Sequence, residues 1–393
     1  VKVNHRFRFY PTASQEHALA KLFGCVRWAY NRALEYRSRT FKETGKGPSY
    51  GECSAAFFQW KRAPEHAFLR EVSCVPLQQS LRHLEQAYAN FFAGRARYPH
   101  FRSKRDKQSA EFTRSAFNWD QQNRNLSLAK IGRLRIRWSR VIKTAPSTVT
   151  ITKDSAGRYF VTLTIDESRA SLPGNQAAVG IDLGLKTLAV LSSGEKIEPL
   201  KPLNKALRKL RRAGRILSRR KNGSGRRARQ RLKVARLHAR IADTRKDFLD
   251  KTTTDLVRRF SAITIEDLNV RGMMGNRRLA RAIADAGFGE FRRMLTYKCA
   301  WSGRKLEVVD RFEPTTKRCA KCQRIIPSLQ LSARTWTCQG CGAVLDRDLN
   351  AATNILAAGH AATARGGSVR RSSVSAGDRN SRRSVNQPAL CKS

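Results

Sequence analysis

Two pairs of cysteines restrict the fold of this chain more than any other feature of the sequence. Cys319 and Cys322 form one C-x-x-C pair, Cys338 and Cys341 form a second, and fifteen residues separate the pairs. Four thiolates at this spacing are typical of a zinc site. Because a site with four protein ligands has no open position, it stabilises a small fold and is not catalytic. The pattern therefore predicts a structural Zn²⁺, and four unrelated buried cysteines are the disfavoured alternative.

Carboxylates follow the second cysteine pair directly. The stretch DRDLNAATNIL begins at Asp346, contains Asp348, and continues with apolar residues at helical spacing. Both acids therefore lie at the start of a predicted helix. An acid in this position caps the helix and interacts favourably with its dipole, which is a sufficient explanation for a lone Asp. A catalytic role for Asp348 requires partner acids elsewhere in the chain.

The net charge points to a polyanionic partner. The 393 residues suffice for two or three domains, and they carry 78 Lys and Arg against 30 Asp and Glu, a formal net charge of +48. Such a chain repels itself in a compact state unless a polyanion surrounds it, and nucleic acid is the obvious candidate. An anionic membrane surface is the alternative. The sequence has no apolar run of membrane-spanning length and no signal-peptide core, so we expect no membrane and a cytosolic protein.

The first half of the chain changes from one strand to helices and back to strands. Residues 3–10 alternate apolar and polar side chains, and Thr12 with Gln15 forms a capping-box start for a helix. Residues 77–91 form a second amphipathic pattern. From Asn125 the period becomes two, in short segments separated by turns. These segments predict a small barrel or sandwich, which the first strand joins across a helical insert.

Two further acids lie on predicted strands of the second half. Asp182 interrupts an apolar strand within residues 179–194, and Glu266 ends another strand at 261–268. A charge on a buried strand is costly unless it is paired or bound to metal, and an ion pair is the structural alternative for each. Asp182, Glu266 and Asp348 together suit a ribonuclease-H-like sheet, in which such carboxylates converge to hold two divalent ions for phosphodiester hydrolysis.

The segment 201–240 contains seventeen Lys or Arg and no acid. Leucines are interspersed and Asn222 to Gly225 form a turn, so the segment predicts a basic helical hairpin. A charge run is usually a solvated face, but forty residues of one sign favour phosphate binding.

In their order along the chain, several segments resemble the TnpB family of RNA-guided DNA endonucleases, which bacterial insertion sequences carry and which are considered ancestral to type V CRISPR effectors. The segments are FRFYPTASQ, VPLQQSLRHLEQAYANFF, YPHF, GIDLGLKTLAVLSSG, ITIEDLNVRGM, DAGFGEFRRML, the double C-x-x-C and DRDLNAATNIL. They cover most of the chain from residue 3 to about 358. One departure is Gln323, which follows the first cysteine pair where the family usually has Gly.

The resemblance implies an α+β multidomain fold with a split β-barrel wedge domain, a helical recognition insert, a ribonuclease-H-like RuvC nuclease domain and a zinc-ribbon insert. The implied boundaries are 1–12 and 112–178 for the wedge barrel, 13–111 for the recognition domain, 179–313 and 345–358 for the nuclease domain with its basic helical insert at 199–250, 314–344 for the zinc ribbon that binds target nucleic acid, and 359–393 for a basic tail. We expect the Arg- and Ser-rich tail to be disordered.

The resemblance also implies the site residues and cofactors. Asp182, Glu266 and Asp348 are the expected catalytic acids and the expected ligands of Mg²⁺. Asp348 is preferred over Asp346 because the family's acid lies two residues before Asn-Ala-Ala. Nucleic-acid contacts are expected at Tyr50, Gln78 and Gln79 for a short target-adjacent motif, and at Arg211, Arg212, Arg219 and Arg220 of the basic segment. Helix packing is the alternative for the first three.

The implied partners are a guide RNA from the transposon end, double-stranded target DNA and its displaced single strand. We expect a monomeric protein with one RNA, associated with the nucleoid in the bacterial cytoplasm. Two alternatives stay open. A guided repressor that does not cut would be free to lose its catalytic acids, and an autonomous ribonuclease-H-like transposase would need no RNA.

Overall fold

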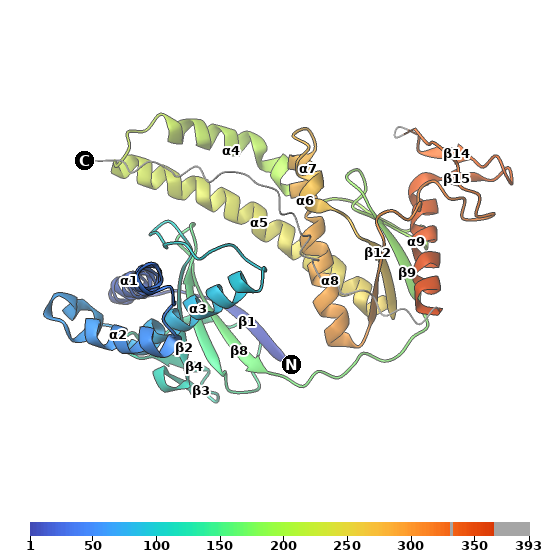
Figure 1. Cartoon of the computed structure of the whole chain (residues 1–393). Coiled ribbons are helices and arrows are strands. Elements are labelled where there is room, and N and C mark those ends of the chain that lie inside the picture. The colour runs from blue at the N-terminus through green and yellow to red at the C-terminus, as the bar shows by residue number, and fades with distance from the viewer. Residues whose placement is uncertain (331–332, 365–393) are drawn as a thin grey trace. The chain divides into compact units, whose positions relative to one another are not determined.

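The structure is a computed structural model that describes residues 1–330 and 333–364 (Figure 1). The chain divides into two compact units. Unit 1 comprises Val1–Ala170 and Lys205–Thr244, and unit 2 comprises Ser171–Asn204 and the residues from Arg245 onward. No helix in this described part of the chain combines the length and hydrophobicity that a membrane span requires.

A five-stranded sheet in the order β2-β7-β8-β1-β6 forms the centre of unit 1. Its strands are β1 (Lys2–Phe9), β2 (Gln108–Thr113), β6 (Ile136–Arg137), β7 (Thr148–Lys153) and β8 (Tyr159–Asp166). The first strand pairs with β8 along its whole length, from Lys2 opposite Asp166 to Phe9 opposite Tyr159. One sheet is therefore built from both sides of the helical insert, as the alternating pattern predicted.

A second, three-stranded sheet accompanies the first. It consists of β3 (Phe117–Asp120), β4 (Asn125–Leu128) and β5 (Gly132–Arg133), and the 3-10 turn η2 (Arg114–Ala116) leads into it. The alternating segment from Leu134 to Trp138 does not form one continuous strand: β5 ends before it, and only Ile136–Arg137 pairs with β1. Closure of these strands into a barrel stays a prediction.

The helical insert of unit 1 begins where the capping box predicted it. Helix α1 (Ala13–Thr44) starts after Thr12, whose hydroxyl accepts from the Gln15 N–H while the Gln15 side chain accepts from the Thr12 N–H. The insert continues with α2 (Tyr50–Arg62), the 3-10 helix η1 (Pro64–Arg70) and α3 (Cys74–Phe92). Strand β2 begins at Gln108, inside the range 13–111 expected to be helical, because the pairing of Ala110 and Phe112 with β7 outweighs the weak local signal.

Unit 2 contains a mixed five-stranded sheet in the order β11-β10-β9-β12-β13. Its strands are β9 (Ala178–Leu183), β10 (Ala189–Leu191), β11 (Lys196–Ile197), β12 (Ala262–Glu266) and β13 (Lys305–Val309). The first three strands pair antiparallel, whereas β12 runs parallel to both β9 and β13. The helices α6 (Val270–Met273), α7 (Ala280–Ala286) and α8 (Phe288–Ser302) precede β13, and Phe288, Phe291 and Met294 belong to the core.

Helix α9 (Arg347–Ala364) packs on this sheet and approaches it closely at two glycines. A Cβ atom added to Gly180 of β9 would lie 2.2 Å from the Ala352 carbonyl oxygen, and one added to Gly359 would lie 2.3 Å from the Thr264 hydroxyl of β12. Both contacts require glycine. The helix also continues past residue 359, where the disordered tail was expected to begin, and residues 365–393 of that tail lie outside the described residues.

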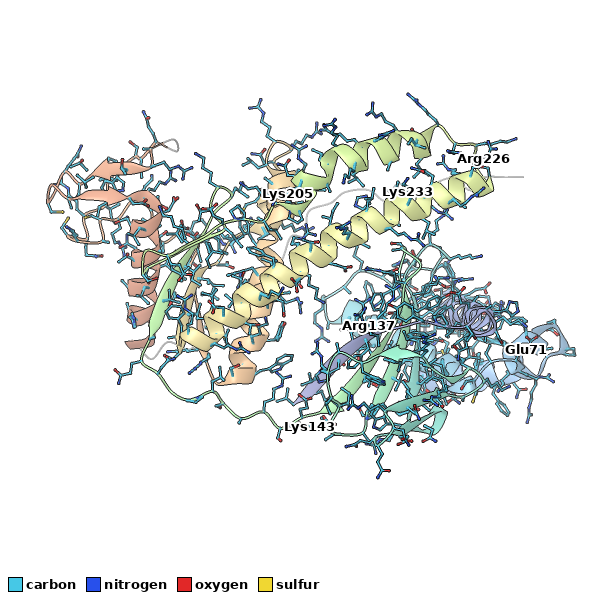
Figure 2. All side chains as sticks on the ribbon, turned by 180° about the vertical axis from the view of Figure 1, so that it is seen from behind. Glu71, Arg137, Lys143, Lys205, Arg226 and Lys233 are labelled. Atoms are coloured by element: carbon cyan, nitrogen blue, oxygen red, sulfur yellow. The ribbon has the colours of Figure 1, made fainter. Side chains whose placement is uncertain are left out.

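The basic segment forms two helices, α4 (Pro202–Ser218) and α5 (Gly225–Arg259), joined by a short turn, which confirms the predicted hairpin. Figure 2 shows their side chains, with Lys205 near the start of α4, Arg226 at the start of α5 beside the turn, and Lys233 further along α5. Residues 205–244 group with unit 1, whereas the family resemblance assigned the whole insert to the nuclease domain. The boundary between the units falls inside α5, which extends nine residues beyond the expected end at 250.

Candidate active site and cysteine cluster

Two of the predicted acids lie at the same edge of the unit 2 sheet. Asp182 is near the carboxyl end of β9, and Glu266 is the last residue of the parallel neighbour β12. Ile181 and Ile265 are partners in the strand register, so Asp182 and Glu266 occupy the next position on each strand. The buried isoleucines fix each strand in the core and leave the acids at the point where the strands end.

The third acid comes from α9. Asp348 lies in the first turn of this helix, which packs on β9 and β12 through Gly180 and Gly359. Burial raises the pKa of Asp182 to about 7, and repulsion from Glu266 and then Asp348 adds to the shift, while Arg347 opposes it. The three carboxylates are therefore within electrostatic range of one another.

Glu266 has a further neighbour that the sequence did not identify. Burial raises the pKa of Glu266, a hydrogen bond from the Thr315 hydroxyl opposes the rise, and repulsion from Asp267 adds to it. Thr315 is itself buried and precedes the first cysteine pair. Its hydroxyl can hold the carboxylate in one orientation while leaving lone pairs free for another partner.

The donor chemistry of the three acids suits divalent cations. The donors are carboxylate oxygens, which are the ligands that magnesium prefers in proteins. Burial, and then repulsion from Glu266 and Asp348, raises the pKa of Asp182 and so disfavours its ionised form in the folded protein. A bound cation would remove that repulsion, because an opposite charge favours the ionised carboxylates.

Neighbouring acids have structural partners instead. The Asp346 carboxylate accepts hydrogen bonds from the N–H groups of Asp348 and Leu349, both at 3.0 Å, and so caps α9; it also pairs with Lys196 at 3.1 Å. Burial raises the pKa of Asp346, but the hydrogen bonds from Leu349, Lys196 and Asp348 outweigh it and leave the pKa lowered. Asp267 is paired with Arg292 and Arg311.

Arg334 is a site residue that the sequence analysis missed. Its Nη1 lies 3.2 Å from Oδ2 of Asp348, and its carbonyl accepts from the Arg347 N–H at 2.8 Å. Nothing in the sequence distinguishes this arginine from the other basic residues. The contact depends on the pairing of β14 (Thr335–Thr337) with β15 (Val344–Asp346), which places residues from both sides of the second cysteine pair next to each other.

The four predicted cysteines come together. The Sγ atoms of Cys319, Cys322, Cys338 and Cys341 all lie within 4.8 Å of one another. The Cys319–Cys341 and Cys322–Cys338 sulfur separations are 3.7 and 3.5 Å. A tetrahedral zinc site with bonds of about 2.3 Å requires sulfur separations of about 3.8 Å. The cluster is thus compatible with a structural zinc.

Backbone turns at the two cysteine pairs are alike. Cys319 accepts from the Gln323 N–H at 2.9 Å, and Cys338 accepts from the Gly342 N–H at 2.8 Å. Both turns end in the left-handed region, at φ 64° for Gln323 and 69° for Gly342. Gln323 therefore adopts a conformation that ordinarily favours glycine, which gives the sequence departure at this position a small conformational cost.

Two buried asparagines attach the cysteine cluster to α9. Asn350 accepts from the Ala320 N–H at 2.9 Å and donates to the Arg318 carbonyl at 2.8 Å, and Asn354 donates to the Thr315 carbonyl at 2.8 Å. Their spacing of four residues puts both on one face of the helix that carries Asp348. That spacing in DRDLNAATN was the available signal, and the sequence analysis did not use it.

The residues predicted to contact nucleic acid lie in unit 1, and they are spread over several helices. Tyr50 is the first residue of α2, and the Arg82 guanidinium lies 5.2 Å from its ring centroid. Gln78 is exposed on α3 and Gln79 is half-buried beside it. Arg211 and Arg212 lie on α4, and Arg219 and Arg220 follow in the turn. The roles of these residues stay predictions.

Three family models match parts of the chain. They are described as "Probable transposase" of the OrfB_IS605 type over residues 160–277, as the "TNB domain" of Cas12f1-like proteins over residues 288–355, and as a "Helix-turn-helix domain" over residues 1–46. The last description does not agree with the structure, in which strand β1 and the single long helix α1 occupy this range.

Full-length relatives are similar over nearly the whole chain. A protein of Streptomyces pristinaespiralis named "Putative RNA-guided DNA endonuclease" is 50% identical over 94% of this chain and 92% of its own length. "Putative RNA-guided DNA endonuclease InsQ" of Escherichia coli is 36% identical over 92% of this chain and 93% of its own length.

A solved structure agrees in fold. The cryo-EM structure of a Cas12f1–sgRNA–target DNA complex matches 90% of this chain and 98% of its own, with a TM-score of 0.57 and 12% sequence identity. The sheets, the TNB-type match and the cysteine cluster thus define a Cas12-like α+β fold. Together with the identity to its full-length relatives, this shows that the chain belongs to the TnpB family, as the sequence motifs indicated.

Proposed function

We propose that the protein is an RNA-guided DNA endonuclease in which Asp182, Glu266 and Asp348 are the catalytic acids. The observation that carries this proposal is the electrostatic effect of Glu266 and Asp348 on the buried Asp182, since the three acids come from two parallel strands and one helix that are widely separated in sequence. Structural acids elsewhere in the unit, such as Asp267 and Asp346, have basic or backbone partners. Buried carboxylates with a raised pKa, such as Asp182 and Glu266, are typical of functional sites, and Asp348 lies beside them with Arg334 as its ion-pair partner.

The strand order supports a RuvC-type nuclease domain. A hairpin of three antiparallel strands followed by two parallel strands, in the order β11-β10-β9-β12-β13, is the arrangement expected of a ribonuclease-H-like sheet. Strands β9 and β12, which are the first and fourth strands of this sheet in chain order, are neighbours in space. Acids at their carboxyl ends therefore lie at the same edge of the sheet. We infer that unit 2 is the nuclease unit.

The acids would hold two Mg²⁺ ions, which when bound supply the positive charge that activates the attacking water and stabilises the leaving oxygen of the phosphodiester. Asp182 and Glu266 would bind the ions from the ends of strands β9 and β12, and the Thr315 hydroxyl would orient Glu266. Asp348 completes the donor set from α9. Arg334 is close enough to Asp348 to neutralise charge on a phosphate bound beside it.

Specificity would come from base pairing with a guide RNA derived from the transposon end. Arg211, Arg212, Arg219 and Arg220 would contact phosphates of the nucleic acids, including the displaced strand, and Tyr50, Gln78 and Gln79 would contribute to recognition of the target-adjacent motif. The net charge of +48 suits such a particle of one protein and one RNA.

The decisive experiment is to express the protein with its native flanking DNA, purify it, and sequence the RNA that remains bound. We expect one discrete RNA that continues beyond the end of the element, and Mg²⁺-dependent cleavage of DNA matching that continuation. Bound guide without cleavage would favour a guided repressor. Heterogeneous RNA, together with an activity that resists ribonuclease, would favour an autonomous transposase.

Asp346 and Asp348 provide a matched pair of substitutions for this assay. We expect Asp348→Asn to lower the cleavage rate by at least about a hundredfold, as loss of one preorganised charged group does. Asp346→Asn keeps an oxygen that can accept from the helix N–H groups, so it should retain nearly full cleavage. Single-turnover cleavage by the two variants measures this difference. Equal losses for both variants would mean that Asp348 acts only through the start of the helix.

A further inference from the structure

Unit 1 contains a basic hollow that none of the roles above includes. It has a volume of about 450 Å³ and is lined by Arg8 of β1, Arg158 of the turn before β8, and Arg236, Arg240 and Asp243 of α5. All of these residues belong to unit 1. The hollow therefore lies between the sheet and the middle of the basic helix.

The wall contributed by the β7–β8 turn is well fixed. Gly157 has φ 76° and donates to the Asp154 carbonyl at 3.0 Å, and a Cβ atom at Gly157 would lie 3.5 Å from the Leu232 side chain of α5. Arg158 pairs with Asp154 at 2.7 Å and also with Asp243 of α5. These contacts join the turn to the helix and neutralise Arg158.

The other cations of the hollow lack such compensation. Within residues 1–330 and 333–364, no carboxylate forms an ion pair with Arg8, Arg236 or Arg240. The Nε of Arg8 is buried, and no described group accepts a hydrogen bond from it. Arg8 also lies opposite Arg137 in the register of β1 and β6, a pairing of like charges that destabilises a sheet.

An aromatic ring gathers further guanidinium groups at the same face. The guanidinium carbons of Arg6, Arg8 and Arg158 lie 3.6, 5.4 and 5.3 Å from the ring centroid of Phe160. Burial lowers the pKa of Arg6; Asp154 and Asp243 oppose the shift, and Arg158 and Arg8 add to it. The cluster thus holds positive charge close together, with one buried donor unused.

We propose that this hollow binds a phosphodiester group of the guide RNA, an inference that rests on the proposed function. A phosphate oxygen would satisfy the Arg8 donor, and its charge would offset the repulsion among the arginines. The unpaired arginines repel one another and so destabilise the folded protein whenever the hollow is empty. A partner that stays bound would offset this repulsion continuously. The guide RNA is such a partner, because it is bound before any target DNA arrives.

The test compares variants of the full chain with equal changes of charge. Arg236→Gln with Arg240→Gln removes two cations from the hollow, and Arg8→Gln removes the unsatisfied donor. Lys251→Gln with Arg258→Gln is the control, because both residues are exposed on the same helix outside the hollow. Arg236→Lys with Arg240→Lys keeps the charge. The probe is the RNA recovered from the wild-type protein, compared with duplex DNA of the matching target.

We expect the hollow double variant to bind this RNA roughly ten- to a hundredfold more weakly than the control. The slope of log K against log salt should fall by about 1 for each phosphate that the protein no longer neutralises, and the lysine variant should restore most of it. Arg8→Gln should weaken RNA binding while the melting temperature stays constant or rises.

Three outcomes would overturn the inference. Equal RNA affinity in the hollow variant and the control would show that the hollow binds no RNA. Loss of DNA binding with unchanged RNA affinity would assign it to the target. If the wild-type protein yields no discrete RNA, the proposed function fails and the inference fails with it. The first two outcomes contradict only the inference and leave the proposed function intact.

Discussion

Replacing Asp182 by Asn should abolish target cleavage and leave guide RNA binding unchanged. The substitution keeps the shape of a half-buried side chain but removes one of three charges that would hold divalent ions. We expect a loss of at least about a hundredfold to a thousandfold in the single-turnover cleavage rate. The affinity for RNA should match that of the wild type, because Asp182 is an acid and contributes no attraction to RNA phosphates. Filter binding on the same preparations measures this affinity.

A stability measurement separates a catalytic charge from a structural one. The folded-state pKa of Asp182 is raised from 3.8 to about 7, so the folded protein binds a proton more tightly than the unfolded chain. Its contribution to stability is therefore lost as the pH rises through about 7. Without divalent ions at pH 8, Asp182→Asn should be more stable than the wild type by up to about 4 kcal/mol.

Divalent ions should reverse that order. Adding Mg²⁺ should raise the melting temperature of the wild type and have little effect on Asp182→Asn, because ion binding stabilises only the state that binds. A variant that lost cleavage and RNA binding together would contradict the assignment. So would a variant that Mg²⁺ stabilises as much as the wild type.

Removal of the metal from the cysteine cluster should have the largest effect on stability. Structural zinc sites contribute about 10–16 kcal/mol of apparent binding free energy at neutral pH, and that energy is coupled to local folding. We expect Cys338→Ser to lose the bound zinc, measured by atomic absorption, and to lose hydrogen-exchange protection across the implied zinc ribbon, 314–344. Cleavage should be lost too, because Asn350 and Asn354 bind α9 to this segment and Arg334 extends from it toward Asp348.

Cys74→Ser is the matched control, since Cys74 is an exposed cysteine outside the cluster. It should retain one zinc per chain and normal cleavage. Retention of stoichiometric zinc by Cys338→Ser, or zinc loss without any change in exchange between 314 and 344, would contradict a four-thiolate structural site.

Local signals in the sequence predicted those features that depend on local physics. The capping box at Thr12 and Gln15, the strands that carry Asp182 and Glu266, and the grouping of the four cysteines were predicted correctly, because each has a clear local pattern. The convergence of acids from distant segments followed from a family resemblance. The influence of Glu266 and Asp348 on the pKa of Asp182 supports this convergence, and it depends on contacts between segments that are far apart in the sequence.

Features set by tertiary pairing escaped the sequence analysis. Strand β2 is decided by its partner β7, and Arg334 becomes a neighbour of Asp348 through the pairing of β14 with β15. The basic hollow likewise needs β1 and α5 together, although Arg8 and Arg236 are more than two hundred residues apart. Each arginine looks the same in the sequence, and only its surroundings decide whether its charge is compensated.

The glycine contacts between α9 and the sheet have a consequence for how much this site can vary. Side-chain packing normally lets two elements drift apart as larger or smaller residues replace one another, but at Gly180 and Gly359 there is no side chain to exchange. At both glycines the helix and the strands lie so close that an added Cβ atom would clash with the partner element. The spacing between Asp348 and the strand acids therefore depends in part on two positions where every substitution by a larger residue would push the helix away from the sheet.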